Sequence, residues 1–135
     1  MLYGESISII MPAYNAEKTI TRAIESIQRQ TYRNWQLIIV NDGSNDTTQE
    51  IIEKKCREDD RIEGYLIENS GPACARNYAM EHAKGKWIAF CDADDWFVSD
   101  ALDTMITAVR GNLSQLGVCY YTTDFDSDNV LCWNK

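Results

Sequence analysis

Apolar residues gather along the chain in short runs, separated by segments with helical spacing. The runs Ile7–Met11 and Gln36–Val40 are almost continuously apolar, which is typical of parallel strands covered on both faces. Between them, apolar side chains recur at i, i+3, i+4 and i+7, the spacing of one buried helical face. These residues are Ile20, Ala23, Ile24 and Ile27. Asn15 precedes this segment and is predicted to cap the helix.

The alternation of strands and helices continues downstream. The pattern next predicts a helix from Thr47, a weaker strand Ile62–Ile67 and a helix Ala73–His82 with Pro72 in its first turn. A strand Lys86–Phe90 and a helix Asp100–Val109 follow; Ser99 is predicted to cap this helix, and Gly111-Asn112 to end it. The last predicted strand is Val118–Thr123. Such alternation implies right-handed crossovers between neighbouring parallel strands. The sequence therefore predicts an α/β protein with a doubly wound, mostly parallel sheet.

Length and charge narrow the class of protein. A chain of 135 residues suits a single domain over 1–135. The net charge of −8 argues against nucleic acid or an anionic membrane surface as the main partner. No apolar run approaches the ~20 residues that span a bilayer, and no signal peptide is recognisable.

The five cysteines form neither a disulfide framework nor a zinc site, because their number is odd and no C-x-x-C occurs. We expect reduced thiols in a cytoplasmic protein. Cys74 follows a turn, and without a histidine placed to activate it we expect a small buried thiol. His82 is the only histidine, and on a helix it is predicted to be a surface or packing residue rather than a base.

Polar segments follow three of the predicted strands. They read "PAYNAE" after the first strand, "NDGSND" after the second and "DADD" after the fourth. Each segment alone is compatible with an ordinary turn, helix cap or solvated loop. In open parallel sheets, however, ligands bind at the carboxyl ends of the strands. Three polar strand ends at one edge of the sheet therefore predict a binding site.

The acidic segment after the fourth strand has a specific chemical use. Asp92, Asp94 and Asp95 would repel one another unless a positive group lay among them. Mg²⁺ and Mn²⁺ bind carboxylate oxygens and substrate phosphates together, so a divalent ion could link this acidic protein to a diphosphate. Neither G-x-G-x-x-G nor G-x-x-x-x-G-K-[ST] occurs, which argues against a dinucleotide fold and a P-loop.

Four segments in order resemble the motifs of family 2 glycosyltransferases. They are "SIIMPAYNAEKTI", "WQLIIVNDGSNDTT", "GPACARNYAM" and "GKWIAFCDADDW", within Ser6 to Asp103. The resemblance implies the GT-A fold, a Rossmann-like fold that binds nucleotide-diphospho-sugars. It also implies transfer of a sugar from a nucleotide diphosphate to an acceptor, with inversion at the anomeric carbon.

The resemblance assigns roles to individual residues. It implies that the base pocket is lined by Pro12, Ala13 and Tyr14, with Glu17 near the nucleotide. It implies that Asp42 hydrogen-bonds a pyrimidine base, although Asn41 stands where many members carry another aspartate. It places Arg76 and Asn77 near the nucleotide, after the turn at Gly71. It places Asp92 near the ribose, Asp94 on the Mn²⁺ or Mg²⁺ ion, and Asp95 behind the metal or facing the sugar.

The family's catalytic base lies well downstream of D-x-D, in the acceptor half. Asp124, Asp126 and Asp128 come too early for this role, so we assign no base and expect an incomplete domain that lacks the acceptor half. We expect UDP as the nucleotide, by family frequency alone, and a glycan or lipid-linked acceptor. A lipid acceptor would place the parent enzyme at the inner face of the cell membrane.

Two other functions remain open. The chain could be a nucleotide-binding module without transfer activity. It could also be a nucleotidyltransferase-like enzyme, although "PAYNAEKT" lacks the glycine- and lysine/arginine-bearing loop usual in such enzymes.

An incomplete sheet would expose an apolar edge or face, which predicts self-association into a homo-oligomer.

Overall fold

The computed structural model describes residues 5–111, 118–119 and 132–133. Its main sheet contains four parallel strands in the order β3-β2-β1-β4. The strands are β1 (Ile7–Ala13), β2 (Trp35–Asn41), β3 (Ile62–Leu66) and β4 (Trp87–Phe90). The predicted parallel α/β sheet is confirmed, and the strand bounds differ by no more than two residues from those expected.

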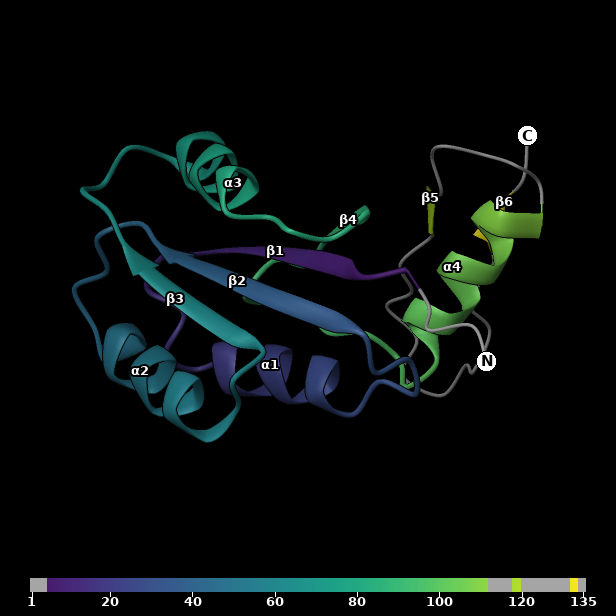
Figure 1. Cartoon of the computed structure of the whole chain (residues 1–135). Coiled ribbons are helices and arrows are strands. Elements are labelled where there is room, and N and C mark those ends of the chain that lie inside the picture. The colour runs from purple at the N-terminus through teal and green to yellow at the C-terminus, as the bar shows by residue number, and fades with distance from the viewer. Residues whose placement is uncertain (1–4, 112–117, 120–131, 134–135) are drawn as a thin grey trace.

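Helices cover both faces of this sheet (Figure 1). Helices α1 (Ile20–Gln28) and α2 (Thr48–Glu58) lie on one face, and α3 (Pro72–Glu81) lies on the other. Helix α4 (Ala101–Gly111) follows β4. The fold is therefore doubly wound, and the direction of strand addition reverses between β1 and β4. In the described part of the chain, no helix is long and apolar enough to cross a membrane.

A second sheet is formed by two short antiparallel strands, β5 (Val118–Cys119) and β6 (Cys132–Trp133). The strand predicted over Val118–Thr123 begins where β5 does, and its remaining residues lie outside the described ones. The described residues also do not include Asp124, Asp126 and Asp128.

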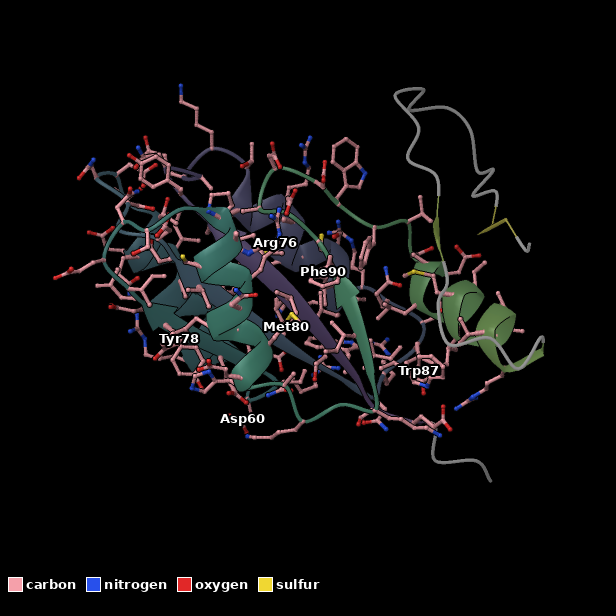
Figure 2. All side chains as sticks on the ribbon, turned by 90° about the horizontal axis from the view of Figure 1, so that it is seen from above. Asp60, Arg76, Tyr78, Met80, Trp87 and Phe90 are labelled. Atoms are coloured by element: carbon pink, nitrogen blue, oxygen red, sulfur yellow. The ribbon has the colours of Figure 1, made fainter. Side chains whose placement is uncertain are left out.

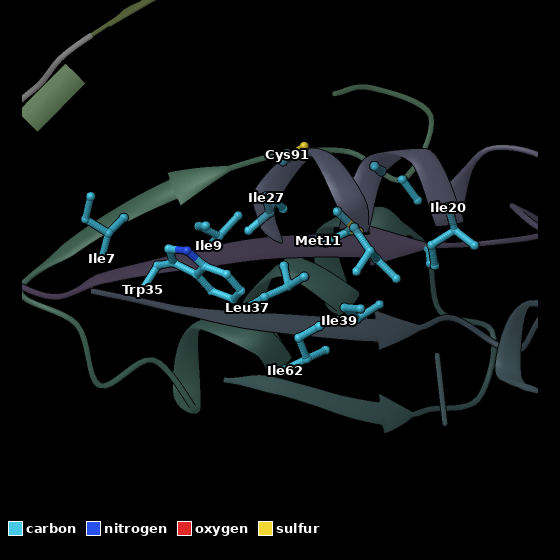
Figure 3. Packing of buried hydrophobic residues seen from close by; sticks show 14 of the residues in the cluster. Ile7, Ile9, Met11, Ile20, Ile27, Trp35, Leu37, Ile39, Ile62 and Cys91 are labelled. Carbon is cyan, nitrogen blue, oxygen red and sulfur yellow. The ribbon is translucent and has the colours of Figure 1, made fainter. Parts of the chain in front are cut away.

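The hydrophobic core has two parts because the side chains of β1 and β2 alternate between the faces of the sheet. Ile9 and Leu37 belong to the larger cluster, which α1, α2 and α4 complete (Figure 3). Ile10 and Ile38 point to the other face and pack with Ala75 of α3. All four strand residues are fully buried, which explains their uninterrupted apolar runs.

Two sequence predictions about single residues were wrong. Asn15 does not cap α1: its φ is +46°, and the N-cap of α1 is Thr19. The Asn15 side chain instead accepts a hydrogen bond from the Asn45 backbone N–H at 2.8 Å. Cys74 is exposed rather than buried, because the inward positions of α3 are taken by Ala75 and Ala79. His82 is a packing residue as expected, stacked on Tyr78 at 4.9 Å between ring centroids.

Strand β4 forms one edge of the described sheet and carries an exposed apolar face. Ile88 and Phe90 are 41% and 53% exposed, and Met80 of α3 is 42% exposed. Figure 2 shows Phe90 and Met80 between β4 and α3. The exposed apolar face expected from the sequence is therefore present, while self-association remains a prediction.

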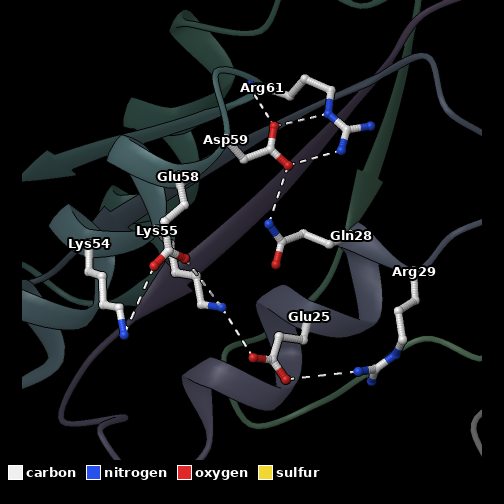
Figure 4. A network of polar contacts seen from close by, with 8 residues as sticks. All are labelled: Glu25, Gln28, Arg29, Lys54, Lys55, Glu58, Asp59 and Arg61. Atoms are coloured by element: carbon white, nitrogen blue, oxygen red, sulfur yellow. Dashed lines mark hydrogen bonds and ion pairs between the residues drawn. The ribbon is translucent and has the colours of Figure 1, made fainter.

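A polar network ties α1 to the turn that precedes β3 (Figure 4). Asp59 accepts hydrogen bonds from Arg61 Nε at 3.0 Å and Nη2 at 2.9 Å, and from Gln28 Nε2 at 3.2 Å. The Arg61 hydrogen bonds lower the pKa of Asp59 from 3.8 to about 2, against the effect of burial. The ionised carboxylate therefore stabilises the fold above pH 3.8, and this contribution is lost as the pH falls through about 2.

This pH dependence is testable with Asp59→Asn. Relative to wild type, the variant should lose about 2 kcal/mol of unfolding free energy at pH 6, and this difference should shrink by about 1 kcal/mol at pH 3. Urea unfolding at the two pH values measures both quantities. Asp60→Asn alters the exposed neighbouring carboxylate and should show neither effect. A difference for Asp59→Asn that is equal at both pH values would contradict the role of its ionised form.

Candidate functional site

A cavity of about 1000 Å³ lies at the carboxyl ends of the parallel strands, where strand order reverses between β1 and β4. Its wall is formed by the segments that follow β1, β2 and β4 and by the loop that leads into α3. Eight of the ten residues assigned from the sequence line it: Pro12, Ala13, Tyr14, Glu17, Asp42, Arg76, Asp92 and Asp94. Polar segments far apart in the sequence therefore meet as predicted.

The other two assigned residues lie outside this cavity. Asn77 is exposed on α3 and is not among the lining residues, so the structure does not bring it to the site. Asp95 lines an adjacent hollow of about 390 Å³ together with Arg76, Phe90 and Asp92. The two hollows share Arg76 and Asp92, which form an ion pair with 3.0 Å between Nη2 and Oδ1.

The acidic segment brings three carboxylates close enough to share one cation. One carboxylate oxygen each of Asp92, Asp94 and Asp95 lies within 4.8 Å of the others. Burial raises the pKa of Asp95, and the negative charges of Asp94 and Asp92 raise it further. Three convergent carboxylate oxygens, with no protein cation between them in the described contacts other than Arg22 and Arg76, suit a hard divalent ion such as Mg²⁺ or Mn²⁺. The donor set thus fits the expected metal.

Protein cations also hold the acidic segment. Arg22 of α1 donates from Nη2 to the Asp94 carbonyl oxygen at 3.5 Å. Its guanidinium lies 3.8 Å from the centroid of the Trp96 ring, and its charge acts to lower the pKa of Asp95. Beneath the segment, burial raises the pKa of the Cys91 thiol to about 12, with a further contribution from the nearby aspartates. Cys91 therefore stays neutral.

Asp42 is buried at the end of β2 and organises the loop before α3. Its Oδ1 accepts the Ser70 N–H at 2.7 Å, and its Oδ2 accepts the Gly71 N–H at 3.0 Å. The Asn69 side chain donates to the Asp42 carbonyl oxygen at 3.0 Å. Gly71 has φ of +96°, a conformation that glycine adopts without strain. Asp42 thus shapes one wall of the cavity through backbone groups.

Sequence reasoning missed several residues of the cavity wall. They are Asn15, Ala16, Lys18, Thr19, Asn45, Asp46, Asn69, Pro72 and Ala93. Most flank assigned residues and could have been included by adjacency. Asn69 follows β3, and the "NSGP" turn to which it belongs carried no chemical signal of its own.

The chain resembles proteins of one family over nearly its whole length. The family model described as "Glycosyl transferase family 2" matches residues 8–131. An Escherichia coli relative named UDP-Glc:alpha-D-GlcNAc-diphosphoundecaprenol beta-1,3-glucosyltransferase WfgD is 42% identical over 110 residues, which cover 78% of this chain and 42% of WfgD. The chain spans between 16% and 43% of the length of eight such curated relatives.

Solved structures share the fold. The S. aureus protein TarS, residues 1–349 in complex with UDP, superimposes with a TM-score of 0.73 at 30% identity, covering 78% of this chain and 32% of that one. The mannosyltransferase PcManGT from Pyrobaculum calidifontis, in complex with GDP-Man and Mn²⁺, superimposes with a TM-score of 0.66 at 27% identity. That match covers 81% of this chain and 32% of PcManGT.

Proposed function

The chain belongs to glycosyltransferase family 2, and we propose that it binds a UDP-sugar together with a divalent metal ion. The sugar would then be transferred to a glycan or lipid-linked acceptor, with inversion at the anomeric carbon. The observation that carries the proposal is the cavity at the strand-order reversal, where Asp42, Arg76 and the Asp92–Asp95 segment meet. A cavity of about 1000 Å³ has room for a nucleotide diphosphate.

In the proposed complex, each wall of the cavity has one task. Tyr14 is half-exposed at the cavity and offers an aromatic face to the base, while Asp42 holds the loop before α3 in place. Asp94 binds the metal ion, with Asp92 and Asp95 beside it. An ion held there would supply Lewis-acid stabilisation of the negative charge on the departing diphosphate. Arg76 adds a fixed positive charge next to Asp92.

The choice of nucleotide, metal and acceptor rests on the relatives. UDP occurs in the TarS complex and Mn²⁺ in the PcManGT complex, and the WfgD name gives a diphosphoundecaprenol acceptor. A lipid-linked acceptor would place the enzyme peripherally at the cytoplasmic face of the membrane. We assign no residue of this chain as the catalytic base. Because the chain spans less than half of these curated relatives, we propose the transfer activity for the whole protein and donor binding for this chain.

Calorimetric titration of the chain with UDP tests this proposal. We expect binding in the presence of Mn²⁺ and a loss of affinity of at least tenfold when EDTA removes the metal. GDP serves as the comparison nucleotide and should bind more weakly than UDP. Equal UDP binding with and without metal would contradict the metal site. Equal binding of GDP and UDP would contradict the assignment of a pyrimidine base.

A further inference from the structure

Glu17 was assigned to the nucleotide from the sequence, but its carboxylate already has partners within the protein. Glu17 Oε2 accepts the Thr47 N–H at 3.1 Å and the Thr47 hydroxyl at 2.8 Å. The Glu17 N–H in turn donates to Asp46 Oδ2 at 3.2 Å. These hydrogen bonds join residues about 30 positions apart, at the cavity ends of β1 and β2.

Three more hydrogen bonds join the same two loops. The Asn15 N–H donates to Ser44 Oγ at 2.9 Å, and Asn15 Oδ1 accepts the Asn45 N–H at 2.8 Å. The Ala16 N–H donates to Thr48 Oγ1 at 2.9 Å. We call this set of contacts between residues 15–17 and 44–48 the loop clasp. Its partners are side chains and backbone N–H groups, and only the contact between Ala16 and Thr48 is fully buried.

Glu17 has a distinct place in the loop clasp because it also caps a helix of another segment. Thr47 is the N-cap of α2 and makes no capping hydrogen bond with its own side chain. The Glu17 carboxylate accepts the Thr47 N–H and places a negative charge at the helix N-terminus, where the helix dipole favours it. The loop that carries Tyr14 is thereby attached to a rigid element.

We propose that Glu17 is a positioning residue for the nucleotide: it holds the loop after β1 against the N-terminus of α2, so that the Tyr14 side of the cavity is formed before the ligand arrives. This inference rests on the proposed function. A loop that is already ordered loses less conformational entropy on binding, so the clasp increases affinity without a contact between Glu17 and the ligand. Glutamine at position 17 keeps a carbonyl oxygen as the acceptor and should replace glutamate in this role.

Calorimetry of UDP binding with Mn²⁺ tests the proposal, together with hydrogen exchange of the Thr47 amide. Glu17→Ala should weaken UDP binding about tenfold and speed Thr47 exchange, whereas Glu17→Gln should stay within about threefold of wild type for both. Thr47→Ala removes the hydroxyl donor and should weaken binding in the same direction. Glu50→Ala removes a negative charge from the exposed first turn of α2 and should change neither quantity.

Either of two results with the Glu17 variants would overturn the inference. If Glu17→Gln weakened UDP binding as much as Glu17→Ala while the Thr47 amide stayed protected, the carboxylate would be contacting the ligand directly. If Glu17→Ala left Thr47 exchange and UDP affinity unchanged, the clasp would not depend on Glu17. A wild-type chain that binds no nucleotide would refute the proposed function and the nucleotide role of Glu17 together, and Thr47 exchange would still show whether Glu17 holds the two loops.

Discussion

Replacing Asp94 with alanine should abolish Mn²⁺-dependent binding of UDP and leave the fold intact. Asp94 is exposed, and its carboxylate oxygen lies within 4.8 Å of those of Asp92 and Asp95. Removing one of three convergent donors deprives the cation of a charged ligand, and we expect the affinity for UDP with metal to fall to that of the wild type in EDTA, a loss of at least about tenfold. The free energy of unfolding should change by no more than about 0.5 kcal/mol, since an exposed loop carboxylate contributes little to the core.

The Asp94 experiment needs a control for charge alone. Asp60→Ala removes one negative charge from an exposed position in the turn before β3, outside the cavity lining (Figure 2). It should bind UDP with Mn²⁺ as wild type does. If Asp94→Ala retained metal-dependent binding at wild-type affinity, the assignment of Asp94 to the metal would be wrong. If both variants lost affinity equally, the effect would come from net charge rather than from a ligand position.

The sequence predicted the sheet well because β1 and β2 are buried on both faces. Such strands need long apolar runs, and a parallel sheet brings their carboxyl ends to one edge. The meeting of Tyr14, Asp42 and Asp94 at one cavity therefore followed from the positions of the polar segments. To predict that these residues meet, it was enough to know where the strands end, and no side-chain conformation was needed.

Predictions that depend on the orientation of one side chain were less successful. Arg76 and Asn77 are neighbours on α3, where successive residues point about 100° apart. Both cannot face the same cavity, and the weak amphipathic pattern of "ACARNYAM" did not show which one does. Asn15 looked like a helix cap because it precedes an apolar helical face, but its partner is the Asn45 N–H, 30 positions away.

The two sides of the cavity differ in how far they are formed without a ligand. On the side with Glu17, hydrogen bonds join two loops. The acceptors are the carboxylates of Glu17 and Asp46 and the hydroxyl of Thr48, and each accepts a backbone N–H of the other loop. The side with Asp94 gathers negative charge that only Arg22 and Arg76 offset among the described contacts. We expect the nucleoside side to change little on binding, and the acidic segment to gain most of its order from the metal and diphosphate.

Asp42→Ala should have the largest effect on stability of the changes considered, lowering the free energy of unfolding by about 2–4 kcal/mol. Asp42 is only 4% exposed, and its two carboxylate oxygens accept the backbone N–H groups of Ser70 and Gly71. Alanine would remove the acceptor of both N–H groups and would release the loop that leads into α3. UDP affinity should fall with it, because this loop forms a wall of the cavity.

Urea unfolding and hydrogen exchange of the Ser70 and Gly71 amides measure the two parts of the Asp42 effect. Asp42→Asn keeps one acceptor oxygen but turns an NH₂ group toward the second N–H, so it should recover no more than about half of the lost free energy. Glu68→Ala removes an exposed acid two residues before Ser70 and should behave as wild type. Wild-type stability and unchanged Ser70 exchange in Asp42→Ala would show that the loop is held by other contacts. Loss of UDP binding without loss of stability would instead indicate that Asp42 acts on the ligand directly.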